Sequence, residues 1–167
     1  PKAGLLFPAT LLALAAWLLK QDIARRTVHQ KGLTRFIAVC LLSGYVWLSI
    51  GALILLSAGG IVPNSAAYGA GLHAILLGFV FAMVFGHAPI IFPAILSVRL
   101  PYHPLFYVPL LVLHLSLVLR IAGTLIGEAQ MRRVGGALNA VALALFVLGV
   151  VSSVVRGASD SGRSAGR

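Results

Sequence analysis

The stretch GLHAILLGFVFAMVFGHAP, residues 71–89, decides the fold of this chain, because it is apolar almost from end to end. A helix can cross a bilayer when about 20 consecutive residues are predominantly apolar. The whole chain shares this character: 60% of its 167 residues are hydrophobic, 10% are charged, and the mean hydropathy is +1.03. Soluble domains carry about 25% charged residues. The composition therefore predicts an integral membrane protein.

Apolar segments recur along the sequence and predict an all-α, polytopic transmembrane helical bundle. We expect about five membrane-spanning helices, over residues 3–19, 35–58, 68–96, 105–125 and 137–155. Polar stretches or stretches rich in glycine and proline separate them. Residues 1–155 are expected to form one bundle. Residues 156–167 are small, polar and basic, and we expect a flexible cytoplasmic tail there.

Basic side chains are distributed unevenly along the chain, whose net charge is +10. Most of them lie in the first predicted loop, the third loop and the tail: Lys20, Arg25, Arg26, Lys31, Arg35, Arg99, Arg156, Arg163 and Arg167. In a five-helix topology these segments share one side of the membrane. Basic residues gather on the cytoplasmic side. We therefore expect the N-terminus outside and the C-terminus in the cytoplasm of a bacterial inner membrane, and no nucleic-acid partner.

Carboxylates and cysteine are too scarce for several kinds of chemistry. The acidic residues Asp22, Glu128 and Asp160 all fall in predicted loops or in the tail, so a proton relay of buried acids has no candidate. The single cysteine, Cys40, excludes an intrachain disulfide and a cysteine-ligated iron–sulfur cluster. No catalytic residue is predicted.

Histidines are prominent among the ionisable residues inside the predicted spans. His73, His87 and His114 lie in two consecutive spans, whereas His29 and His103 fall in loops. An ionisable residue within the membrane marks a functional site by default. The alternative is that each neutral imidazole hydrogen-bonds across a helix interface. Both interpretations stay open at this point.

His73 and His87 are predicted to share a face of the third span. Their separation of 14 positions returns to within about 40° of the starting direction at about 100° per residue. A row of small residues follows on the opposite side: Ala74, Gly78, Ala82 and Gly86. Such a row lets another helix backbone approach closely. The span is thus predicted to have a packing face and a histidine face.

His87 and His114 are predicted to lie at comparable depths. Counted at about 1.5 Å per residue, His87 is about 10 Å and His114 about 13 Å from the same end of the bundle. The two imidazoles would then face each other as axial ligands of a haem b, or as copper ligands, since neutral imidazole binds both metals. Pro89 and Pro93 leave helix carbonyls without partners, so we also consider a kink directly after His87.

His73 and Arg120 fall near the opposite end of the same two spans. A histidine and an arginine at one depth would hold a haem propionate or another bound anion. Arg120 has an alternative role, because long basic side chains also extend along apolar surface to the membrane interface.

The stretch from residue 43 to residue 83 resembles the NnrS family of bacterial membrane proteins. The resemblance rests on a Gly-Tyr-aromatic helix, a short loop, and a second helix with Leu-His-Ala and a following glycine. Here these are Gly44-Tyr45-Val46-Trp47, Leu72-His73-Ala74 and Gly78. The resemblance implies a polytopic protein that contains haem and copper and is tied to nitric-oxide and nitrogen-oxide metabolism. Of the candidate histidines, only His73 is matched by a motif of the family.

The chain departs from the NnrS pattern beyond these motifs. The family usually has a Gly-His-Thr-Gly-Arg motif further along the chain. This sequence instead has Gly86-His87-Ala88-Pro89-Ile90, without the threonine or the arginine. The resemblance therefore covers only part of the chain, and His87 rests on its own position in the third span.

We expect an integral membrane haem-binding protein of NnrS-like type, with copper as the alternative metal, in redox or nitrogen-oxide metabolism. The alternative is a non-enzymatic structural membrane subunit of a larger respiratory or redox complex. The expected partners are the lipid bilayer and either other membrane subunits or the remainder of a longer chain, since the sequence begins with Pro1 rather than Met.

Overall fold

Helices and the turns that join them account for the residues that the computed structural model describes, which are residues 3–96 and 102–165. Five of the described segments are long and apolar enough to cross a membrane: Gly4–Gln21, Gly32–Ser57, Ala66–Ile95, Pro104–Leu125 and Ala129–Arg156. The prediction of an all-α bundle with five such helices is confirmed.

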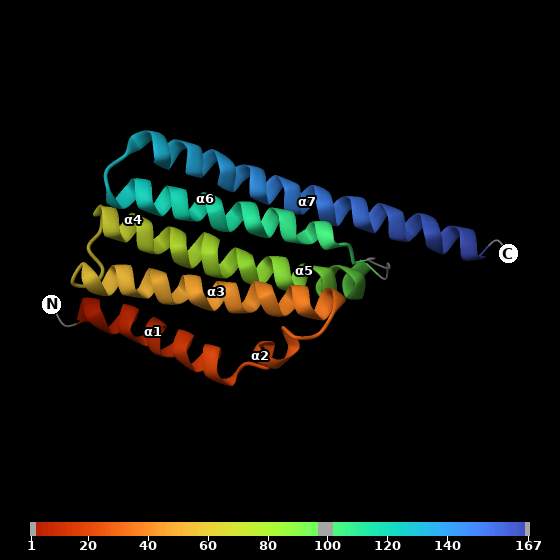
Figure 1. Cartoon of the computed structure of the whole chain (residues 1–167), viewed down its shortest axis with the longest axis horizontal. Coiled ribbons are helices and arrows are strands. Elements are labelled where there is room, and N and C mark those ends of the chain that lie inside the picture. Colours follow the sequence, from red (N-terminus) through yellow and green to blue (C-terminus); the bar gives the residue numbers. More distant parts are fainter. Residues whose placement is uncertain (1–2, 97–101, 166–167) are drawn as a thin grey trace.

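The long helices lie side by side in chain order, and each runs opposite to its neighbour (Figure 1). They are α1 (Ala3–Gln21), α3 (Gly32–Ser57), the continuous helix made of α4 (Ala66–His73), η1 (Ala74–Val80) and α5 (Phe81–Leu96), then α6 (Tyr107–Leu125) and α7 (Ala129–Ala165). Two short elements lie in the connections: α2 (Ala24–Thr27) and the 3₁₀ turn η2 (Pro104–Phe106). Connections this short make successive helices antiparallel neighbours.

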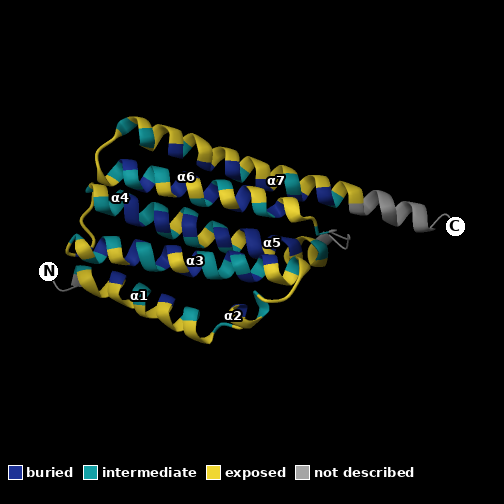
Figure 2. Ribbon diagram, in the orientation of Figure 1, coloured by how far each residue is buried: buried dark blue, intermediate teal, exposed yellow. Residues whose placement is uncertain are grey.

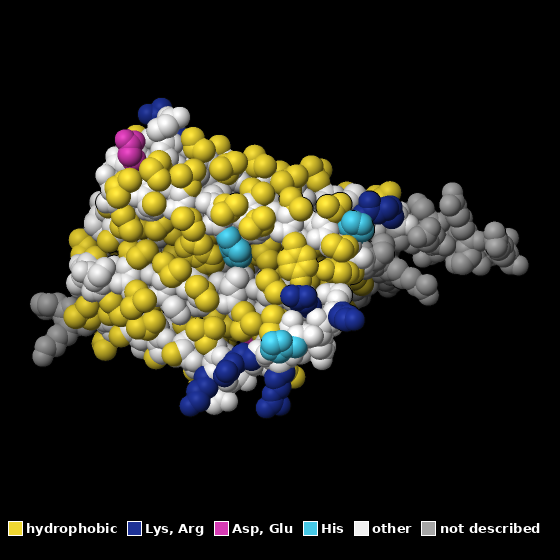
Figure 3. Space-filling model, in the orientation of Figure 1, with side chains coloured by type: hydrophobic (Ala, Val, Ile, Leu, Met, Phe, Trp, Pro, Cys, Tyr) yellow, Lys and Arg dark blue, Asp and Glu magenta, His cyan; other side chains and the backbone are white. Residues whose placement is uncertain are grey.

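Apolar side chains fill the space between neighbouring helices. Figure 2 shows the buried positions along the sides where helices meet, and they include Phe36, Phe85, Leu113, Leu117 and Phe146. Figure 3 shows that the face in view is also largely apolar along the length of the bundle. A surface of this kind suits contact with lipid, which is as apolar as the core. The fold is therefore that of a membrane protein.

A π-helical segment, η1, interrupts the third span directly after His73. The predicted row of small residues runs through it, and Ala74, Gly78, Ala82 and Gly86 are all buried. In an α-helix, four residues turn about 40° beyond a full revolution, so such a row drifts around the helix. A π turn holds more residues because its hydrogen bonds reach i+5. η1 therefore offsets the drift and keeps the row on one side.

The row of small residues packs against α3. A Cβ atom added to Gly78 would overlap Cγ of Trp47, and one added to Gly86 would lie 3.0 Å from Cβ of Cys40. From the other side, a Cβ on Gly44 would lie 3.3 Å from Cβ of Ala82. Close approach of this kind depends on small side chains at the contact. The predicted packing face is confirmed.

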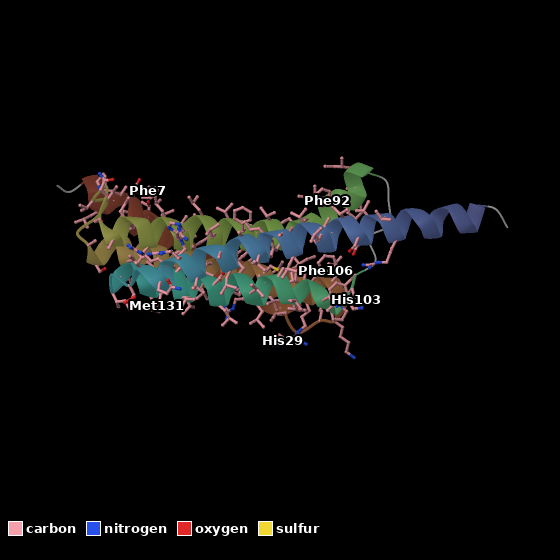
Figure 4. All side chains as sticks on the ribbon, turned by 90° about the horizontal axis from the view of Figure 1, so that it is seen from above. Phe7, His29, Phe92, His103, Phe106 and Met131 are labelled. Carbon is pink, nitrogen blue, oxygen red and sulfur yellow. The ribbon has the colours of Figure 1, made fainter. Side chains whose placement is uncertain are left out.

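α5 bends away from the other helices at its end, where Phe92 lies (Figure 4). Pro89 and Pro93 lie inside this helix. Proline lacks an N–H and its ring clashes with the carbonyl four residues earlier, so prolines are the usual cause of such a bend. The structure thus shows the kind of distortion considered for the segment after His87.

α7 extends beyond the predicted span at both ends. The helix begins at Ala129 and continues to Ala165, whereas the predicted span covered residues 137–155. Extending a formed helix adds one hydrogen bond for each residue fixed, which is far easier than starting a new helix. Two basic residues of the charge argument, Arg99 and Arg167, lie outside the described residues.

Candidate functional site

Trp47 and His114 join α3 to α6 through their side chains. The indole Nε1 of Trp47 donates a hydrogen bond to Nδ1 of His114 over 2.9 Å, and the two ring centroids are 6.2 Å apart. Gly78 of η1 provides the space for the indole, because any side chain there would overlap Trp47. Three elements that are distant in sequence thus meet around one indole ring.

The Trp47 bond assigns the tautomer of His114. An indole N–H only donates, so Nδ1 of His114 must present a lone pair. A neutral imidazole that accepts at Nδ1 carries its proton on Nε2. In the structure this Nε2 is buried and has no hydrogen-bond partner among the described residues.

His73 has the opposite tautomer. Its Nδ1 lies 2.6 Å from the carbonyl oxygen of Gly69, one turn earlier in α4. A carbonyl oxygen only accepts, so Nδ1 carries the proton and Nε2 presents a lone pair. The side chain is half-buried.

His87 shares this tautomer but lies on the outside of the bundle. Its Nδ1 donates to the carbonyl oxygen of Met83 over 2.8 Å, so its Nε2 also presents a lone pair. The imidazole is exposed and borders a cavity of about 340 Å³ on the surface of α5. The other lining residues are apolar: Met83, Val84, Ala88, Ile91 and Phe92.

Among the described residues, no contact and no shared cavity brings His87 and His114 together. α5 packs chiefly on α3, whereas α6 packs on α7 and also contacts α4 and η1. His114 is engaged by Trp47, and the cavity beside His87 is lined by α5 alone. The expected shared face of His73 and His87 also assumed an uninterrupted α-helix, and the π turn between them changes that angle.

The side chain of Arg120 lies against α7 and not beside His73, its predicted partner. Its backbone and Cβ approach Gly135, and its Nη1 occupies the space where Gly136 would carry a Cβ. No described contact joins Arg120 to His73. The two adjacent glycines of α7 therefore leave room for the arginine at the α6–α7 interface.

Two polar contacts were not anticipated from the sequence. The hydroxyl of Tyr45 donates to a carboxylate oxygen of Asp22 over 2.6 Å, tying α3 to the turn before α2. The hydroxyl of Ser116 contacts the side-chain amide of Asn139, and both residues are buried between α6 and α7. The Gly-Tyr-aromatic motif singles out Tyr45, but it does not indicate the contact with Asp22. Ser116 and Asn139 were visible only as polar residues within apolar spans.

A comparison with protein families matches residues 1–155 to the family described as a domain of unknown function, DUF8744. The chain belongs to the DUF8744 family. No curated protein and no solved structure matches it. The functional reading of this DUF8744 chain therefore rests on its own residues.

The histidines of the DUF8744 chain differ in how well they would fit a haem or copper ion. A ligating histidine normally donates its other ring N–H to an acceptor, which leaves the ligating nitrogen with its lone pair. His73 and His87 have this arrangement, whereas His114 accepts from Trp47 at Nδ1 and carries its proton on Nε2. Among the described residues, no three His, Cys, Asp or Glu side chains are grouped to hold a metal ion.

Proposed function

We propose that the protein is an integral membrane haem-binding protein of NnrS-like type in the bacterial inner membrane, acting in redox or nitrogen-oxide metabolism. His87 is the ligand in this proposal, and His114 is a structural residue. One observation carries it: His87 presents an open Nε2 beside an apolar cavity, on the outer face of a membrane-spanning helix.

The position of His87 supports an occupant at this cavity. Ionisable residues inside a membrane almost always face the bundle interior or a water-filled space, or pair with another group. His87 is exposed, and its one described hydrogen bond uses Nδ1. A ligand at Nε2 would complete the polar contacts of the imidazole in an otherwise apolar setting.

The residues that line the cavity offer one apolar surface, from a single helix, to the flat body of a haem. Cofactor sites are mostly apolar, with a few polar groups that fix the orientation. Here the walls are aliphatic and aromatic, and His87 is the one ionisable group among the lining residues. Haem, when bound, supplies one-electron chemistry or a binding site for a small gas. His73 is the second candidate ligand because its Nε2 presents the same lone pair.

An absorbance spectrum of the purified full chain with added haem tests the proposal, recorded first oxidised and then reduced. The wild-type protein should show a Soret band that His87→Ala abolishes, while His103→Ala leaves it unchanged. His114→Ala should also keep the band. Loss of the band in His114→Ala with retention in His87→Ala would overturn the ligand assignment. Stoichiometric copper without a haem spectrum would favour the copper alternative.

A second candidate function is a non-enzymatic membrane subunit of a larger redox complex. The Trp47–His114 bond favours it, because here a histidine within a span serves to join two helices. In this case none of the histidine variants changes a spectrum, and His114→Ala lowers stability. The absorbance experiment therefore separates the two candidates.

A further inference from the structure

A groove at one end of the bundle combines an apolar floor with a basic rim. It lies between α1, the α2 segment and α3, with a volume of about 610 Å³. Its lining residues are Leu19, Arg25, Val28, His29, Val39, Leu42, Ser43 and Val46. From Val39 to Val46 the floor follows about 10 Å of α3, at 1.5 Å per residue. The apolar part of the groove therefore runs along membrane-spanning helix.

Arg25 and His29 form the ionisable part of this rim. Both side chains are exposed, and Nη1 of Arg25 donates to the carbonyl oxygen of Lys20 over 3.2 Å. Arg25 also borders a second, adjoining cavity of about 580 Å³. That cavity adds further polar side chains: Lys20, Gln21, Asp22 and Arg26. Figure 3 shows Lys and Arg side chains gathered at this end of the bundle.

The positive charge of the rim has little compensation from the protein. Asp22 is the only acidic residue before Glu128 in the sequence. Its carboxylate accepts from the hydroxyl of Tyr45 over 2.6 Å and from the backbone N–H of Ala24 over 2.7 Å. It supplies one negative charge beside the positive charges of Lys20, Arg25 and Arg26. An anion from outside the chain would supply the missing negative charge.

We propose that this groove binds one anionic phospholipid. The phosphate lies at Arg25 and His29, and an acyl chain lies along the apolar floor between α1 and α3. Basic clusters at the end of membrane helices attract anionic lipid head groups. A phospholipid also matches the floor, which a free phosphate leaves unfilled. This site is separate from the histidine cavity on α5 and does not depend on the proposed function.

Native mass spectrometry of the full chain in detergent tests the site, with phosphatidylglycerol or phosphatidylcholine added at equal concentration. The wild-type protein should retain one phosphatidylglycerol in preference to phosphatidylcholine. Arg25→Gln should weaken retention of phosphatidylglycerol about fivefold, the factor expected for one basic residue near a lipid surface. Ser43→Trp, which fills the groove without changing the charge, should abolish the preference.

Arg133→Gln is the matched control, because it removes one exposed positive charge near the start of α7, away from the groove. It should leave phosphatidylglycerol retention unchanged. Equal retention of the two lipids by the wild-type chain would overturn the proposal, as would an equal effect of Arg25→Gln and Arg133→Gln. Displacement of phosphatidylglycerol by millimolar inorganic phosphate would also overturn it, because the ligand would then be phosphate alone.

Discussion

The indole of Trp47 donates to Nδ1 of His114 over 2.9 Å, and this partly buried bond joins α3 to α6. It also decides what His114 is able to do. A ring that accepts at Nδ1 keeps its proton on Nε2, so it presents no lone pair to a metal. His73 and His87 donate to backbone carbonyls instead and keep that lone pair. The hydrogen bond from Trp47 thus makes His114 a structural residue, whereas His73 and His87 remain candidate ligands.

Replacing Trp47 with phenylalanine should lower the free energy of unfolding by about 1 kcal/mol, because side-chain hydrogen bonds between membrane helices average about 0.6 and reach about 1.7 kcal/mol. A double-mutant cycle with His114→Phe, followed by thermal unfolding in detergent, measures the coupling. Trp17→Phe is the control, since Trp17 is 60% exposed on α1. A coupling energy of zero would show that the bond does not stabilise the bundle.

Gly78→Ala should destabilise the bundle by about 1–3 kcal/mol, the usual result of forcing extra volume into a packed interface. The added methyl would overlap the indole of Trp47. Gly69→Ala is the matched control, because nothing lies within 4 Å of a Cβ at Gly69. It should be neutral or stabilising, since alanine favours helix over glycine by about 1 kcal/mol. Thermal unfolding of the two variants side by side gives the comparison, and equal stability would contradict the close packing of η1 on α3.

Tyr45→Phe should loosen the turn between α1 and α2 by removing the bond to Asp22. Hydrogen bonds to charged groups contribute about 1.5–3 kcal/mol, and we expect about 1 kcal/mol here because Asp22 is partly exposed. Limited proteolysis of the α1–α3 connection and thermal unfolding both report the change. Tyr68→Phe serves as the control, and an equal effect of the two variants would exclude a specific role for the Asp22 contact.

Reporter fusions test the proposed orientation. Fusions at Gly32 and Gly162 should report the cytoplasm, and a fusion at Pro63 should report the outside, because basic residues are retained on the cytoplasmic side. The opposite pattern at all three sites would reverse the topology and place the basic groove on the outer leaflet.

The spans and the small-residue packing face could be predicted from the sequence, because both depend on residue type at fixed spacing. Ala74, Gly78, Ala82 and Gly86 needed no knowledge of their partner to be identified as a close-packing surface. The histidine geometry was harder. Hydropathy shows that His114 is inside a span, but its partner Trp47 is 67 positions away in sequence. Which ring nitrogen of His114 carries the proton depends on that distant contact.

The π segment was also beyond sequence-based reasoning. Residues Ala74–Val80 are apolar and favour a regular helix as readily as a widened one. The widened turn keeps the small residues in line against α3, and the apolar sequence alone carries no information on that contact. The calculated angle between His73 and His87 assumed about 100° per residue throughout, and the widened turn lies between them.

The widened turn of η1 also determines where this span can change in length. A π turn holds one residue more than an α turn, so deleting one residue between Ala74 and Val80 would let an ordinary α-helix close and leave the later residues facing as before. Deleting one residue in α4 instead, with η1 kept, would rotate everything after it by about 100°. Ala82 and Gly86 would then leave α3, and His87 would point in a new direction. Insertions and deletions are tolerated at exposed loop tips. In the α-helical part of this span, by contrast, a change of one residue in length would reorient everything after it, and η1 is the place that absorbs a deletion of one residue.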